Sequence, residues 1–126
     1  MTAPVRSAEA RRTETPNATM TTLASPSAGG STSLSLWQVE MRAGQRGPVH
    51  VFDREQLWSV RAGTVSIAVD GTEHVLTAGD SLVVPARSER QVTAGADAEL
   101  VACGPADAQA SVPGEEVSRG TPPWIG

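Results

Sequence analysis

Between residues 44 and 94 the sequence alternates short apolar runs with glycine, proline and Asp-Gly at close intervals. The run 64–69 places three branched side chains on one face, because side chains in a strand alternate with a period of two. The Asp70-Gly71 that follows is a strong short-range signal for a tight hairpin. Closely spaced β-rich runs with such turns predict a small antiparallel barrel or sandwich.

Further runs of the same kind extend this pattern over most of the chain. We expect strands at residues 34–41, 49–53, 56–61, 64–69, 81–84, 90–93 and 99–103, with a return strand after Asp70-Gly71 that carries His74 and Leu76. In the run 56–61, Gln56, Trp58 and Val60 share one face, which we assign to the interior. No window keeps a helical period over three turns, so the predicted fold class is all-β.

The first 33 residues have a different composition. They consist almost entirely of Thr, Ser, Ala, Pro, Gly and charged residues, and their only sizeable apolar side chains are Val5, Met20 and Leu23. Such a segment buries too little surface to offset the entropy lost on ordering. We therefore predict a disordered tail over residues 1–33 and a barrel over residues 34–112.

The last segment, residues 113–126, ends in Pro122-Pro123-Trp124-Ile125. The two prolines stiffen the chain, and the tryptophan and isoleucine supply apolar area that is expected to dock. We predict that this segment docks through Trp124. It covers either the outside of the barrel or a partner subunit, or it partly closes the mouth of a pocket.

Composition excludes several classes of function. A formal net charge of -4 disfavours sequence-independent binding of nucleic acid. All ten basic residues are arginine, which excludes a Schiff-base lysine and a P-loop lysine. No stretch approaches the roughly 20 apolar residues of a membrane helix, and Arg11-Arg12 lacks the apolar segment of an export signal. With Cys103 as the single cysteine, no internal disulfide can form, and we expect a cytoplasmic protein.

Two glycine-led segments share a regular spacing. The first is Gly44, five residues, His50, one residue, Phe52, three residues, Gln56, six residues and Gly63. The second is Gly79, five residues, Pro85, one residue, Arg87, two residues, Arg90, three residues and Ala94. In spacing and order, the two segments resemble the two motifs of the cupin family. The resemblance implies an RmlC-like jelly-roll barrel from about Leu34 to Cys103. It also implies a homodimer, which would relieve the marginal stability of so small a domain.

Typical cupins hold a metal ion through two histidines and a glutamate of the first motif and one histidine of the second. The matching positions here hold His50, Phe52, Gln56 and Arg90. Phenylalanine cannot ligate, a glutamine amide is a weak ligand, and an arginine repels cations. Glu55 could replace Gln56 only through a β-bulge, because neighbouring residues of a strand point to opposite faces. We therefore predict no metal and no cofactor, with a metal-dependent enzyme of atypical site as one alternative.

The altered positions predict an anion site instead. Arg90 offers a donor fork suited to a carboxylate, phosphate, enolate or phenolate, and Phe52 and Trp58 add flat apolar walls. The fixed positive charge lowers the pKa of His50, leaving a neutral imidazole that can act as a base. We assign catalytic roles to His50 and Arg90 in a metal-independent isomerase or cyclase. Phe52, Gln56 and Trp58 are the predicted ligand-binding residues for its small-molecule partner.

The same residues also fit structural roles. Arg90 suits an ion pair with Glu99 or Glu55 that closes the barrel mouth, and His50 suits a buried core histidine. The protein would then be a non-catalytic ligand-binding or sensing barrel. Arg87 stands at a glycine position of the second motif, so a turn of positive φ there would be strained.

Overall fold

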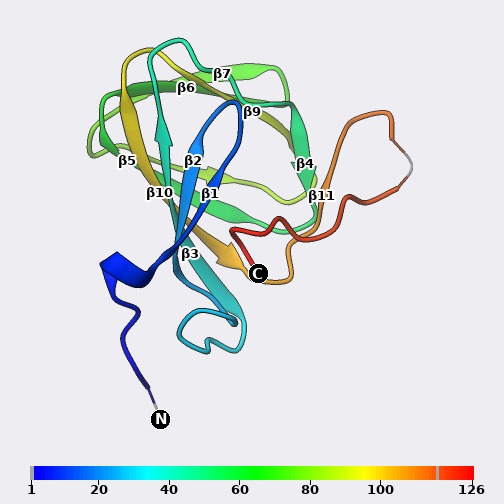
Figure 1. The fold of residues 1–126 in the computed structure, drawn as a ribbon. Coiled ribbons are helices and arrows are strands. Elements are labelled where there is room, and N and C mark those ends of the chain that lie inside the picture. The colour runs from blue at the N-terminus through cyan, green and yellow to red at the C-terminus, as the bar shows by residue number, and fades with distance from the viewer. Residues whose placement is uncertain (1, 116) are drawn as a thin grey trace.

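Two antiparallel sheets face each other in the computed structural model, which describes residues 2–115 and 117–126 (Figure 1). The elements are η1 (Ser7–Glu9), β1 (Arg11–Glu14), β2 (Thr19–Ala24), β3 (Leu34–Met41), β4 (His50–Phe52), β5 (Gln56–Ala62), β6 (Thr64–Val69), β7 (Thr72–Thr77), β8 (Ser81–Val84), β9 (Glu89–Ala94), β10 (Ala98–Pro105) and β11 (Ala110–Ser111). The 6-stranded sheet has the order β1-β2-β3-β10-β5-β8, and the 5-stranded sheet has the order β11-β4-β9-β6-β7. Strands distant in sequence are therefore neighbours, as in a jelly roll.

The predicted strands are confirmed along the barrel. Strands β3, β6 and β8 have the expected bounds, and the others differ by a few residues at their ends. Gln56 and Val60 are buried on β5 while Leu57 is 48% exposed, as the alternation predicts. In the described part of the chain, no helix has the length and apolar character needed to cross a membrane.

The register of β10 brings two tryptophans together in the core. Ala102 pairs with Trp37 of β3 on one side and with Trp58 of β5 on the other. The small side chain between them leaves room for the two indoles, whose ring centroids lie 6.2 Å apart at an interplanar angle of 89°. This edge-to-face geometry is favourable for aromatic pairs. The pair fixes the part of the 6-stranded sheet that faces β4 and β9.

The prediction of disorder over residues 1–33 is wrong for residues 11–14 and 19–24. These residues form the hairpin β1–β2, which pairs with β3 and extends the 6-stranded sheet. Met20 and Thr22 are buried on the inward face of β2. Because the edge of β3 supplies a ladder of backbone hydrogen bonds, a threonine-rich strand joins the sheet although Met20 is the one large apolar side chain that it fully buries.

The turn before β9 contains the strained residue that its sequence predicts. Arg87 is exposed and has a φ of 66°, in the left-handed region that favours glycine. Its backbone N–H donates to the carbonyl of Phe52 over 2.8 Å. The turn therefore ties the start of β9 to the end of β4, and both strands contribute to the cavity described below.

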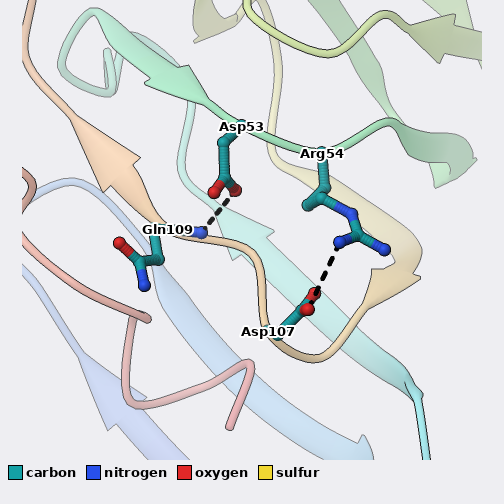
Figure 2. A network of polar contacts seen from close by, with 4 residues as sticks. All are labelled: Asp53, Arg54, Asp107 and Gln109. Atoms are coloured by element: carbon teal, nitrogen blue, oxygen red, sulfur yellow. Dashed lines mark hydrogen bonds and ion pairs between the residues drawn. The ribbon is translucent and has the colours of Figure 1, made fainter.

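Polar contacts also hold the end of β4 to the segment before β11 (Figure 2). The backbone N–H of Gln109 donates to Asp53 Oδ1 over 2.8 Å, and the N–H of Asp53 donates to the carbonyl of Gln109 over 3.2 Å. Arg54 and Asp107 form an ion pair of 3.2 Å between exposed side chains. Exposed pairs of this kind contribute little to stability, so the two Asp53 hydrogen bonds hold β4 to this segment more than the ion pair does.

Candidate functional site

A cavity of about 320 Å³ lies between the two sheets. All of the predicted site residues line it: His50, Phe52, Gln56, Trp58 and Arg90. The chain has three tryptophans, one phenylalanine and no tyrosine, and every one of these aromatic side chains contributes to the cavity wall. Trp37 is the cavity aromatic of the barrel that lies outside both motifs. Its cavity position depends on the pairing of β3 with β10, which no local motif encodes.

His50 and Arg90 belong to neighbouring strands of the 5-stranded sheet. They are register partners in the antiparallel pair β4–β9, so their side chains project from the same face of the sheet. Phe52 follows His50 by two residues and projects from that face as well. The imidazole and the phenyl ring meet edge to face, with centroids 5.8 Å apart.

Gln56 connects the two sheets across the cavity. Its Oε1 accepts a hydrogen bond of 2.9 Å from Arg90 Nη1 and one of 3.3 Å from Trp58 Nε1. Because arginine only donates, the oxygen of the amide must face Arg90, and Gln56 Nε2 is left without a partner. Gln56 is 1% exposed, whereas Glu55 is exposed. The structure thus places Gln56, and not Glu55, at the cavity.

Arg90 is a buried cation without a carboxylate partner. It is 5% exposed, and its guanidinium carbon lies 4.8 Å from the centroid of the Phe52 ring, in cation–π geometry. Two ion pairs form among the described residues, Arg54–Asp107 and Arg119–Glu115, and neither includes Arg90. The alternative of a structural ion pair with Glu99 or Glu55 is therefore wrong. Burial lowers the pKa of Arg90 to about 10, with the more distant charge of Asp70 acting in the opposite direction.

The pKa of His50 is lowered, as the sequence predicts. Burial is the larger cause, followed by the positive charges of Arg90 and Arg119. Both effects disfavour the imidazolium because it would bring a second positive charge into a poorly hydrated space. At neutral pH the ring is thus a neutral imidazole with one nitrogen able to accept a proton.

Among the cavity-lining residues, the fully buried side-chain polar atoms that lack a partner are all hydrogen-bond donors. They are Arg90 Nε, Arg90 Nη2, Gln56 Nε2 and Trp37 Nε1. A buried donor without an acceptor costs free energy, and it costs more when it carries charge. An acceptor-rich, negatively charged molecule is the complement of such a donor set.

Comparison with known proteins identifies the family. The family described as "Cupin domain" matches residues 37–103, which is more than half of the chain. The chain belongs to the cupin family. Among curated proteins, none matches this cupin.

Solved structures with the same fold include several barrels. An RmlC-like cupin from Shewanella frigidimarina has 21% sequence identity and a TM-score of 0.71, with 82% of this chain and 92% of that chain covered. KdgF from Halomonas sp. has 18% identity and a TM-score of 0.71, with the same coverage of 82% and 92%. Salicylate 1,2-dioxygenase from Pseudoaminobacter salicylatoxidans, solved as adducts with gentisate, has 19% identity and a TM-score of 0.72. This cupin is covered over 83% of its length in that comparison but spans only 31% of the dioxygenase chain.

The residues of this cupin do not fit the metal ion that the family resemblance implies. At the corresponding positions the cavity presents one imidazole, one phenyl ring, one amide and one guanidinium. The amide oxygen of Gln56 already accepts two hydrogen bonds, and the Arg90 charge opposes a cation. Among residues 2–115 and 117–126, no group of three or more His, Cys, Asp and Glu side chains is arranged to hold a metal ion.

Proposed function

We propose that this cupin binds a small organic anion with a flat ring in its barrel, and that binding needs no metal. The observation that carries the proposal is the buried Arg90 guanidinium, which has no carboxylate partner and lies in a cavity walled by aromatic side chains. A bound anion would supply the missing counter-charge and accept hydrogen bonds from Arg90 and Gln56. Aromatic walls with a few convergent polar groups are typical of small-molecule sites.

The experiment is a calorimetric titration of the protein with benzoate, repeated after dialysis against a chelator. Arg90→Ala is expected to lower the affinity about 100-fold, because it removes the charged partner of a buried ion pair. Arg61→Ala is the matched control, since Arg61 is exposed near the end of β5 and does not line the cavity. Equal benzoate affinity in Arg90→Ala and the parent protein would overturn the proposal, as would binding that depends on added metal.

A second candidate function is proton transfer next to a carbonyl. It is favoured by the neutral His50 imidazole, which lies opposite Arg90 in the β4–β9 ladder. In this reaction His50 takes a proton from the carbon beside a carbonyl, and Arg90 stabilises the resulting enolate oxygen. The proton then returns to another atom of the substrate, so the outcome is an isomerisation or cyclisation with no net loss of atoms.

Deuterium exchange at the C3 methylene of phenylpyruvate, followed by NMR in D₂O, tests this second function. We expect the protein to accelerate exchange, His50→Ala to remove most of the acceleration, and Arg61→Ala to retain it. Benzoate binding without any acceleration by the parent protein would instead favour a non-catalytic binding or sensing barrel.

We also propose that this cupin is a cytoplasmic homodimer. Support for the dimer comes from a row of residues on the outer face of the 6-stranded sheet: Leu36, Cys103, Leu57 and Val83 are successive register partners across β3, β10, β5 and β8. Leu57 is 48% exposed and Val83 is 53% exposed, which favours an apolar contact between two copies. Light scattering of the parent protein and of Leu57→Arg tests the dimer, which the charged variant is expected to dissociate.

A further inference from the structure

Two segments outside the family match complete the cavity wall. The β1–β2 turn, Thr15–Ala18, lines the cavity before the matched residues 37–103 begin, and Trp124 lines it after they end. In Figure 1 the hairpin β1–β2, drawn in blue, lies beside β3, and the C-terminal segment is drawn in red. We call the Thr15–Ala18 turn together with Trp124 the cap.

The two parts of the cap are fastened to each other through β2 and the loop that follows it. Thr22 Oγ1 donates to the carbonyl of Trp124 over 2.8 Å. Ser25 and Ser27 both donate to the carbonyl oxygen of Gly126, over 2.9 Å and 2.7 Å. Ile125, next to Trp124, is fully buried at 0% exposure. The end of the chain therefore docks mainly through Ile125, and Trp124, which is partly buried and packs against the core, also lines the cavity.

The turn is held in one conformation by its own hydrogen bonds. Thr15 Oγ1 accepts from the backbone N–H of Ala18 over 3.1 Å and from that of Asn17 over 3.3 Å. Gln45 Nε2 donates to the carbonyl of Pro16 over 3.3 Å and links the turn to the loop before β4. A turn fixed in this way presents a defined wall and not a freely moving loop.

Burial distinguishes the inner part of the cavity from the cap. Arg90, Gln56 and Trp37 are buried, whereas Pro16 is exposed and Trp124 is partly exposed. The charged and hydrogen-bonding groups thus lie deep, and the cap lies on the solvent side. A ligand that places its acid group on Arg90 would direct the rest of its skeleton toward the cap.

We infer that the cap is the specificity-determining part of the site and that Trp124 selects ligands with a flat ring next to the acid group. This inference rests on the proposed anion-binding function and adds the part of the ligand that Arg90 does not recognise. A planar ring gains face or edge contact with the indole, which a puckered aliphatic ring of similar size cannot match.

The test compares benzoate with cyclohexanecarboxylate by calorimetry, because the two probes share a carboxylate and differ in ring planarity. Trp124→Ala is expected to lower the affinity for benzoate about tenfold and that for cyclohexanecarboxylate much less. Trp124→Phe keeps a flat wall and should retain most of the selectivity. Val117→Ala is the control in the same segment, since Val117 is 75% exposed and does not line the cavity.

The outcomes separate this inference from the proposed function. In one outcome, Arg90→Ala abolishes binding of both probes while Trp124→Ala keeps the preference of the parent protein for benzoate over cyclohexanecarboxylate. That result would overturn the role of the cap and leave the proposed anion site intact. If the parent protein binds neither probe, acrylamide quenching decides whether Trp124 covers the cavity. Trp124→Ala and Trp124→Phe both retain Trp37 and Trp58 as the only fluorophores, and we expect stronger quenching in the alanine variant. Equal quenching in the two variants, with folding checked by circular dichroism, would overturn the inference that Trp124 covers the cavity.

Discussion

His50 and Arg90 occupy one register position of the antiparallel pair β4–β9, and the charge of the arginine helps to lower the pKa of the histidine. At these two positions of the motifs, the family resemblance implies metal ligands in typical cupins. Here the pair joins a proton acceptor to a fixed cation. This replacement puts a fixed positive charge at the place where the family resemblance implies a metal ion, and the proposed anion site rests on it.

The lowered pKa of His50 predicts how stability depends on pH. The pKa of an unfolded histidine is 6.5, and the folded value lies below it, so the unfolded chain binds the proton more readily between the two values. The contribution of His50 to stability is therefore complete above about pH 6.5 and is lost as the pH falls toward the folded pKa. Urea denaturation between pH 7.5 and 4.5 should show this decrease, and His50→Asn should make the curve flatter.

NMR provides an independent measurement of the same effect. The chain contains two histidines, so the spectrum of His50→Asn assigns both imidazole signals. The His50 signal should titrate below pH 6.5 and should shift toward that value in Arg90→Met, because one of its two main causes is removed. A His50 signal that titrates at or above pH 6.5 in the parent protein would contradict the assigned environment.

The unpaired charge of Arg90 predicts that Gln56→Glu stabilises the protein and weakens anion binding. The new carboxylate would take the place of the amide that accepts from Arg90 Nη1 over 2.9 Å, and it would give the guanidinium an internal counter-charge. Benzoate then competes with an internal anion, and we expect an affinity loss of about tenfold or more. Thermal unfolding and calorimetry of the same samples measure the two effects.

Arg90→Met is the companion variant for that prediction. It removes the charge, and we expect the unfolding free energy to rise by about 1–3 kcal/mol, because well-packed apolar residues often replace buried charges favourably. Anion binding should be lost. A variant less stable than the parent protein would show that the contacts of Arg90 with Phe52 and Gln56 outweigh the cost of burying the charge.

The sequence was sufficient to predict the barrel but not its N-terminal addition. Strands β3, β6 and β8 could be placed from alternation and turn residues, because each carries its own apolar face. The hairpin β1–β2 lacks such a face and is ordered through its pairing with β3 and through the burial of Met20. Stabilisation by pairing with a distant strand leaves little local signal, so composition alone indicated disorder.

The residues of the candidate site also fall into those that the sequence could place and those that it could not. His50, Phe52, Gln56 and Arg90 could be placed together because the resemblance to the cupin motifs implies their positions in the barrel, and strand alternation adds Trp58 to the face of Gln56. Trp37 and the turn Thr15–Ala18 reach the cavity only through pairing between strands, and the position of Trp124 depends on hydrogen bonds more than 90 residues away. A proline-stiffened end with Trp124 and Ile125 indicated that the segment docks, but it could not show that Ile125 is the buried anchor.

Gly63→Ala is expected to destabilise the barrel strongly. Gly63 has a φ of +77°, and a Cβ there would lie 2.1 Å from the carbonyl oxygen of Asp97, which is backbone and cannot move aside. Strain and overpacking together should cost about 3 kcal/mol or more in unfolding free energy. Gly79→Ala is the control, because Gly79 also has a positive φ (+95°) but nothing within 4 Å of an added Cβ, and it should cost about 1 kcal/mol. Equal losses in urea denaturation would contradict the crowding at Gly63.

Arg87→Gly is expected to stabilise the fold. Arg87 is exposed at a φ of 66°, and glycine adopts this conformation without the steric penalty of a Cβ. The gain should be about 0.5–1 kcal/mol, since the greater flexibility of glycine in the unfolded chain offsets part of the relief. Urea denaturation measures it, and a clear loss of stability would indicate that the arginine side chain makes a stabilising contact.

Restoring the ligand types that the family resemblance implies should convert the proposed anion site into a metal site. Phe52→His, Gln56→Glu and Arg90→His, combined with the native His50, give three imidazoles and one carboxylate around the same cavity. Imidazole and carboxylate ligands suit Zn²⁺, Ni²⁺ and Fe²⁺, and removal of the guanidinium eliminates the opposing charge. We expect the triple variant to retain about one equivalent of Ni²⁺ after gel filtration and to lose benzoate binding, with metal content measured by mass spectrometry. A parent protein that retains one equivalent of Ni²⁺ under the same conditions would contradict the view that Arg90 excludes cations. A folded triple variant that retains none would show that these strand positions do not bring the four side chains together.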